Sequence, residues 1–200
     1  MENIKRVVNF LFELVGAKTA PRSGWQRIGI KVPESLADHA ALSGQIAYIL
    51  ALMEGANPEH SAALALFGDI ARIRTGDENW VSRIYSDTKK KEAAAINAQM
   101  SGLSFAGQFN GLFAELEEDK SREAVIAKDA SFLDMAIQSK YYAANGNKSA
   151  TLWFEGAENS LGTESAKQIF AAAKETGVEE WWMELDSIKK KFEFSRGSKQ

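Results

Sequence analysis

The chain has 200 residues, of which 45% are hydrophobic and 26% charged, and this balance predicts one globular domain with a sizeable core. A formal net charge of -3 gives no overall positive field, which argues against a dedicated binder of nucleic-acid polymers. The absence of cysteine excludes disulfides, thiolate metal ligands and a cysteine nucleophile.

The first predicted element is an amphipathic helix over residues 2–17, with its apolar residues at helical spacing along one broad face. Asn9 and Glu13 interrupt the apolar run, so the segment is too polar for a signal peptide or a membrane span. We therefore expect a cytoplasmic protein. Residues 19–29 contain too many turn-forming residues to continue the helix and are predicted to form a loop.

The rest of the chain repeats a helical pattern to its end. Ser35 is expected to cap a helix that stops at Gly55, and the next helix begins after Pro58 and runs through residue 73. Further helices are predicted over 80–85, 87–100, 103–118, 121–144, 148–160, 163–176 (capped by Thr163) and from 181 through 191. No useful alternating segment appears, so the fold class is all-α: one helical bundle of roughly nine or ten helices over 1–192, followed by a polar tail at 193–200.

Several short motifs occur together in a fixed order. They are RSGW at 22–25, ESLADH at 34–39, ALFGDIARIRTGD at 65–77, AKDASFLD at 127–134, LGTESA at 161–166 and WW at 181–182. In this order and spacing the chain resembles the HD-domain phosphohydrolases of the 5′-nucleotidase type. The resemblance covers about residues 5–185 and implies the HD-domain helical fold.

The resemblance also implies how a divalent ion is held in that family, by a histidine, a His-Asp pair and a distant aspartate, beside a catalytic glutamate. His39 matches the first histidine and Asp69 matches the aspartate of the pair. Gly68 stands at the second histidine, Ser131 at the distant aspartate and Arg72 at the glutamate. The resemblance thus implies a degenerate centre with His39 and Asp69 as residual ligands, and we expect no metal cofactor although family members use a divalent ion.

Neighbouring residues do not replace the missing ligands. Asp129 precedes Ser131 by two helical positions and so points about 200° away around the helix axis. His60 lies too far along its helix to reach the position of Gly68. Arg72, by contrast, follows Asp69 at i+3, where the two side chains can pair. We expect its guanidinium to replace the charge of the ion, in a site where His39, Asp69 and Arg72 are the candidate catalytic residues.

Three further residues match the substrate-binding part of the family's site. The resemblance implies that the loop with Arg22 and Trp25 contacts the nucleotide and that Asp77 contacts its sugar. Arginine offers a fork of donors to phosphate, and tryptophan offers a face for stacking. The expected ligand is therefore a nucleotide or another small phosphorylated molecule.

Each of these residues also has a purely structural interpretation. His39 could be a buried, hydrogen-bonded histidine, the Asp69–Arg72 pair a salt bridge in a vacated cavity, and Trp25 part of the core. His60 is expected at the surface. Residues 89–91 are interpreted as a solvated helix face, and 181–182 as core or subunit-interface packing.

Three functions remain open from the sequence. The first is a non-hydrolytic protein that binds a nucleotide or phosphorylated metabolite. The second is an enzyme, either a metal-dependent phosphomonoesterase or a metal-independent relative that uses His39 as base and Arg72 as electrostatic stabiliser. The third is a structural partner protein with a filled cavity. No membrane partner is expected, and a homodimer is expected by analogy with relatives.

Overall fold

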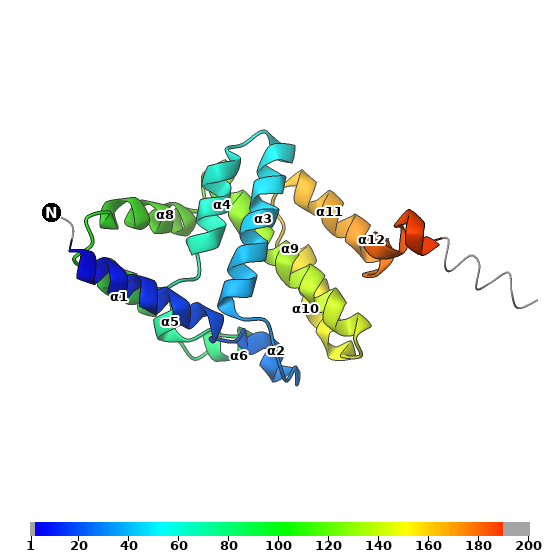
Figure 1. Ribbon diagram of the computed structural model, residues 1–200, viewed down its shortest axis with the longest axis horizontal. Helices are drawn as coiled ribbons and strands as arrows, with labels where there is room; N and C mark the ends of the chain where they lie inside the picture. Colours follow the sequence, from blue (N-terminus) through cyan, green and yellow to red (C-terminus); the bar gives the residue numbers. More distant parts are fainter. Residues whose placement is uncertain (1–2, 190–200) are drawn as a thin grey trace, which may run out of the picture.

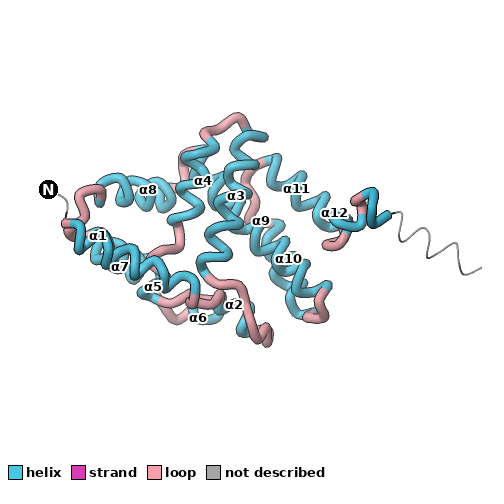
Figure 2. The backbone as a smooth tube through the Cα atoms, viewed as in Figure 1, coloured by secondary structure: helices cyan, strands magenta, loops and turns pink. Residues whose placement is uncertain are grey.

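The computed structural model describes residues 3–189, and its regular secondary structure in this range is helical apart from one isolated bridge between Pro21 and Ser35 (Figures 1 and 2). The α-helices are α1 (Ile4–Val15), α2 (Ser23–Arg27), α3 (Leu36–Glu54), α4 (Pro58–Phe67), α5 (Arg72–Thr75), α6 (Trp80–Arg83), α7 (Thr88–Met100), α8 (Ala106–Glu118), α9 (Arg122–Ala144), α10 (Thr151–Glu158), α11 (Glu164–Glu175) and α12 (Glu180–Met183). Two short 3₁₀ helices, η1 (Gly16–Lys18) and η2 (Lys148–Ala150), and a helical segment at residues 186–189 are also present. The all-α prediction is confirmed.

The two longest helices, α3 and α9, form the centre of the bundle. The Ser35 side chain and Asp38 form a capping box at the start of α3, and Gly55 ends the helix in the left-handed conformation. Ser121 caps α9 by accepting a hydrogen bond from the Ala124 backbone N–H. Helix α3 packs against α4 and α9, while α10 and α11 also lie against α9 (Figure 1). This crossing brings the middle of α9 to the first turns of α3.

The described residues contain more helices than the sequence predicted, for two local reasons. Residues 19–29 were expected to be a loop but include α2, whose first backbone N–H, that of Ser23, donates to the Asp77 carboxylate at 2.7 Å. The helix predicted to run through residue 73 stops at Phe67. Tight bonds such as the one from the Arg72 N–H to the Asp69 carbonyl (3.0 Å) form a turn before α5.

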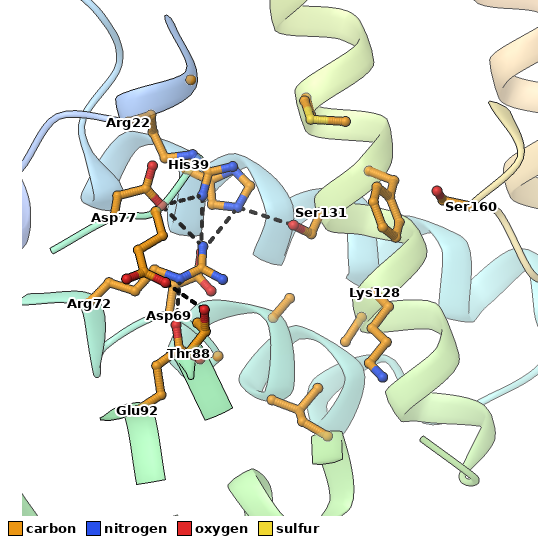
Figure 3. A pocket seen from close by; sticks show the side chains of 18 of the residues that line it. Arg22, His39, Asp69, Arg72, Asp77, Thr88, Glu92, Lys128, Ser131 and Ser160 are labelled. Carbon is orange, nitrogen blue, oxygen red and sulfur yellow. Dashed lines mark hydrogen bonds and ion pairs between the residues drawn. The ribbon is translucent and has the colours of Figure 1, made fainter. Parts of the chain in front are cut away.

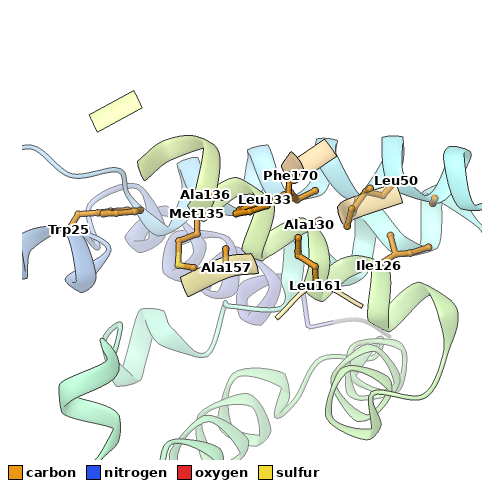
Figure 4. Close-up of a cluster of buried hydrophobic side chains, with 13 residues drawn as sticks. Trp25, Leu50, Ile126, Ala130, Leu133, Met135, Ala136, Ala157, Leu161 and Phe170 are labelled. Carbon is orange, nitrogen blue, oxygen red and sulfur yellow. The ribbon is translucent and has the colours of Figure 1, made fainter. Parts of the chain in front are cut away.

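The largest apolar cluster lies where α3, α9, α10 and α11 meet (Figure 4). Its buried side chains include Trp25, Leu50, Ile126, Leu133 and Phe170. A second cluster beneath α1, α7 and α8 is built around Phe10, Ile96 and Met100. The N-terminal amphipathic helix therefore covers a core of its own beside the central helices.

Helix α3 is long and apolar enough to cross a membrane by length and composition, but it packs between α4 and α9 as a core helix does. At the C-terminal end, Trp181 is 76% exposed, so it is not core packing. The helix predicted from 181 through 191 is interrupted: α12 ends at Met183, residues 184–185 are not helical, and residues 186–189 are helical again. Residues 190–191 of that prediction, the predicted domain boundary at 192 and the tail at 193–200 lie outside the described residues.

Candidate functional site

One pocket of about 970 Å³ is lined by all six residues that the sequence singled out, which Figure 3 labels apart from Trp25. Its lining includes Arg22, Trp25, His39, Asp69, Arg72 and Asp77. These residues come from α2, α3 and the segment between α4 and α6, and the opposite wall is formed by α9. Segments distant in sequence thus converge on a single cavity.

His39 lies at the back of the pocket on α3 and is only 2% exposed. Its Nδ1 is hydrogen-bonded to Asp134 of α9, whose carboxylate is fully buried. On the other side of the ring, Nε2 lies 3.2 Å from the Ser131 hydroxyl and 3.5 Å from Asp69 Oδ2. The imidazole is therefore held in place by α9 and presents Nε2 toward the pocket.

Asp69 is the point where the arginines meet. Its Oδ2 accepts from Arg72 Nη1 at 2.7 Å and from Arg22 Nη1 at 3.3 Å. Burial acts to raise the pKa of Asp69, but the positive charges of Arg72 and Arg22 act against it, and the pKa lies below its usual range. The i,i+3 pair predicted from the sequence is present, with Asp69 in the turn that leads into α5. The carboxylate is thus ionised and neutralised by two guanidinium groups.

Arg72 is tied to three carboxylates. Besides Asp69, it contacts Asp77 at 3.4 Å and donates from Nε to Glu92 of α7 at 3.1 Å. Burial acts to lower the pKa of Arg72, but the negative charges of Asp69, Glu92 and Asp77 overcome it and raise the pKa above its ordinary value. The guanidinium is a permanent positive charge in the pocket wall.

Asp77 and Trp25 are both occupied by contacts within the protein. Asp77, with a 6% exposed side chain, accepts the Ser23 N–H and pairs with both arginines. Trp25 is 2% exposed and donates from Nε1 to Glu34 at 2.7 Å. Both residues border the pocket, and their hydrogen bonds also fix the position of α2.

One exposed aromatic residue that lines the pocket was not predicted from the sequence as a site residue. Trp80, at the start of α6, is 52% exposed and lines the pocket. Its ring stacks on Trp153 of α10 with centroids 5.2 Å apart and planes inclined by 7°, and Trp153 in turn packs on Trp25. The signal in the sequence that could have identified Trp80 as a pocket residue is its position three residues after Asp77, beyond the turn at Gly76.

The two residues considered as replacement ligands are engaged elsewhere. Asp129 lines part of the pocket, but its carboxylate accepts hydrogen bonds from the backbone N–H groups of Gly162 and Thr163, at 2.8 and 2.7 Å. His60 is partly exposed, and its Nε2 lies 2.7 Å from Glu115 of α8. Neither contacts His39 or Asp69 in the described structure.

Glu34, His39 and Asp134 form a buried group whose potential ligand atoms lie within 4.8 Å of one another. In its chemistry this set could hold a metal ion. The His39 Nδ1 atom, however, is hydrogen-bonded to Asp134, and Glu34 accepts from the Trp25 indole. One oxygen of Asp134, Oδ1, is buried with no hydrogen-bond partner.

Glu34 carries an unusual pKa, which leads to a testable prediction. Burial, reinforced by the negative charge of Asp134, raises its pKa to about 7. Because the folded protein binds this proton more tightly than the unfolded chain, the stabilisation is complete below about pH 4.5 and is lost as the pH rises to about 7. We expect this loss to reach about 3 kcal/mol of unfolding free energy.

Glu34→Gln removes the titrating group but keeps an oxygen that can accept from Trp25. Urea unfolding between pH 5 and 8 is expected to show a falling stability for the natural chain and a flatter profile for the variant. Equal slopes for both proteins would contradict a raised pKa at Glu34.

The fold and pocket define an all-α protein with a histidine and an aspartate at the base of a polar cavity, and comparison with known proteins gives the family. Residues 16–173 match the family described as HD domain, and the chain belongs to this family. It is 34% identical over 152 residues to the 5′-deoxynucleotidase hdd1 of Schizosaccharomyces pombe, covering 71% of this chain and 76% of that protein. It is 28% identical over 145 residues to the 5′-deoxynucleotidase HDDC2 of Danio rerio, covering 71% of this chain and 70% of the relative.

Solved structures agree with this assignment. The PH0347 protein from Pyrococcus horikoshii OT3 superposes with a TM-score of 0.73 at 26% identity, over 83% of this chain and 97% of that one. A conserved hypothetical protein from Pyrococcus furiosus superposes with a TM-score of 0.74 at 22% identity, over 84% of this chain and 99% of that one, which supports the fold. The chain is therefore a 5′-nucleotidase-like member of the HD phosphohydrolases.

Proposed function

We propose that this protein binds a nucleotide or another small phosphorylated metabolite in the pocket, with arginines in place of a tightly held divalent ion. The observation that carries the proposal is the convergence of Arg22 and Arg72 on Asp69 Oδ2. The similarity to 5′-deoxynucleotidases supports a nucleotide as the ligand class. Arginine forks match the geometry of phosphate oxygens.

The donor atoms at the family's metal position fit a divalent ion poorly. His39 Nε2 and Asp69 Oδ2 face each other at 3.5 Å, but Gly68 has no side chain and Ser131 offers a neutral hydroxyl. A cation bound to Asp69 would lie next to the Arg72 guanidinium, whose Nη1 is 2.7 Å from the same oxygen. Few ligands and a repelling charge both weaken such a site.

Each arginine keeps a donor for a ligand. Arg22 and Arg72 use Nη1 for Asp69 and Asp77, and their Nη2 groups donate to no residue of the described chain. A phosphate entering the pocket competes with carboxylates for these charges, so part of its binding energy is offset. We therefore expect affinity in the micromolar rather than the nanomolar range.

Trp80 supplies the surface for the base. One face of its indole stacks on Trp153, the residue is about half exposed, and it lines the pocket. A Cβ on Gly156 would lie 2.8 Å from the Trp80 ring, so the glycine permits this close approach. A purine or pyrimidine stacked on the outer face of Trp80 would bury apolar area. In other proteins, replacing such an aromatic residue with alanine weakens binding by about 1–3 kcal/mol per stacked base.

Calorimetric titration in the presence of EDTA tests this function. Deoxynucleoside 5′-monophosphates are expected to bind, the matching nucleosides to bind at least about tenfold more weakly, and Arg22→Gln to abolish the difference. Arg27→Gln, on the exposed side of the same short helix, is the matched control and should bind like the natural chain. Absence of binding by every monophosphate would refute the proposal.

The cellular location and assembly complete the proposal. We place the protein in the cytoplasm and expect a homodimer, as inferred from the character of the N-terminal helix and by analogy. Light scattering across a concentration series measures the assembly state. A mass equal to one chain at all concentrations would contradict the dimer.

A further inference from the structure

Ser131 lies in the middle of α9 with its hydroxyl directed at His39 (Figure 3). The Ser131 Oγ to His39 Nε2 distance is 3.2 Å, and both residues line the pocket. This is the distance at which a hydroxyl donates to an imidazole nitrogen. A pocket-facing serine therefore contacts a potential base.

The same helix supplies the group that orients the histidine. Asp134 follows Ser131 at i+3, on the same face of α9, and its fully buried carboxylate holds His39 Nδ1. A carboxylate only accepts hydrogen bonds, so His39 Nδ1 donates to Asp134, and in the neutral imidazole Nε2 then carries the lone pair that faces Ser131. The order hydroxyl, imidazole, carboxylate is that of a nucleophilic triad.

Asp69 does not displace Ser131 as the partner of the imidazole. Its Oδ2 lies 3.5 Å from Nε2 but accepts from Arg72 at 2.7 Å and Arg22 at 3.3 Å. The two guanidinium groups offset the negative charge of Asp69, so this carboxylate competes weakly for a hydrogen bond with His39 Nε2. The hydrogen-bond partner of Nε2 in the described structure is the Ser131 hydroxyl.

We propose that Ser131, His39 and Asp134 make this protein a metal-independent phosphomonoesterase that acts through a phosphoserine. The inference rests on the proposed function, because it needs a phosphomonoester in the pocket. Ser131 and His39 are the catalytic residues. Asp134 is a positioning residue that acts through His39.

The reaction balances with these groups and water. Ser131 Oγ forms a bond to phosphorus while His39 Nε2 takes the hydroxyl proton, and the bond from phosphorus to the ester oxygen breaks. The leaving alcohol receives that proton from His39. Water then attacks the phosphoserine, giving one proton to His39 and forming the new phosphorus–oxygen bond. The serine oxygen leaves, regains the proton from His39, and inorganic phosphate is released.

The surroundings favour phosphoryl over acyl transfer. Ser131 lies inside the continuous helix α9, where each backbone N–H donates to the carbonyl four residues earlier. The N–H groups near Ser131 are therefore not available to form an oxyanion hole. The groups available for developing negative charge are the guanidinium groups of Arg22 and Arg72. They suit a transferring phosphoryl, whose charge is spread over three oxygens.

The experiment measures binding, turnover and the covalent intermediate on one preparation in EDTA. Calorimetry gives the affinity for deoxynucleoside 5′-monophosphates, phosphate release gives turnover, and acid quenching followed by peptide mass spectrometry locates a phosphoserine. We expect the phosphoryl group on Ser131 and a loss of turnover of at least about 100-fold in Ser131→Ala, with affinity changed less than about threefold. Asp134→Asn should lower kcat without weakening binding.

Ser139→Ala is the matched control on the same helix, since that hydroxyl bonds to the Ala136 carbonyl at 2.7 Å. Circular dichroism melting confirms that each variant is folded. Binding without turnover or phosphoserine overturns the triad and leaves the proposed function intact, whereas absence of binding overturns both. Turnover that survives in Ser131→Ala, or that requires added metal, also overturns the triad.

Discussion

Gly68→His, Arg72→Glu and Ser131→Asp, combined in one variant, are expected to create the divalent metal site that we propose the natural chain has lost. The three changes put the residues implied by the HD-domain resemblance back at their positions, next to His39 and Asp69. The variant would offer two imidazoles and two carboxylates to one ion. Replacing Arg72 with Glu also removes the positive charge that would repel the ion.

The structure leaves room for these side chains. A Cβ on Gly68 would lie 3.2 Å from the Leu64 carbonyl oxygen and 3.5 Å from Leu116, so a small shift admits it. Gly68 already lines the pocket, as do Arg72 and Ser131. Without metal, Arg72→Glu places a new carboxylate beside Asp69, Asp77 and Glu92, and we expect the metal-free variant to be less stable than the natural chain.

Thermal melting against Mn²⁺ or Ni²⁺ measures the effect. At a metal concentration 100 times the dissociation constant, the variant gains about 2.7 kcal/mol of stability, which for a chain of this size corresponds to an increase in Tm of about 5–10 °C. The natural chain should show no saturable shift, and Arg72→Glu alone should show a weak one. A stoichiometric ion in the natural chain at His39 and Asp69 would contradict the account of a replaced charge.

The long helices could be predicted from the sequence because local signals determine their ends. Ser35 and Thr163 were predicted as caps and both accept the expected backbone hydrogen bond. Helix α2 could not be predicted this way. It depends on the burial of Trp25 in the core and on an N–H contact to Asp77, 54 positions later in the chain.

The site, too, could be predicted only where local sequence motifs determine it. Composition and motifs could place His39, Asp69, Arg22 and Arg72 in one cavity, since their roles follow from resemblance and spacing. They could not show that Ser131 contacts His39, because that pair is 92 positions apart and depends on how α3 crosses α9. In sequence Ser131 indicated only the loss of a carboxylate; in the structure it is a hydroxyl beside an oriented imidazole.

Asp129→Ala is expected to destabilise the protein by about 3–5 kcal/mol, because this carboxylate attaches the start of α11 to α9. Asp129 is 1% exposed and accepts from the Gly162 and Thr163 N–H groups and, at 2.6 Å, from the Thr163 hydroxyl. Truncation leaves two backbone donors without their acceptor, which costs about 1–3 kcal/mol each. It also removes the charge-assisted hydrogen bond from the Thr163 hydroxyl. Thr163 is also the N-cap of α11, so that helix loses its fixed starting point.

Chemical unfolding measures this loss, with Glu164→Ala as the control. Glu164 is an exposed carboxylate one residue into the same helix, and its removal should cost less than about 1 kcal/mol. Asp129→Asn should fall between the two, because its amide keeps one acceptor oxygen but presents a donor to the other N–H. Similar losses for Asp129→Ala and Glu164→Ala would mean that α11 is held by its apolar residues, such as Phe170, rather than by this buried carboxylate.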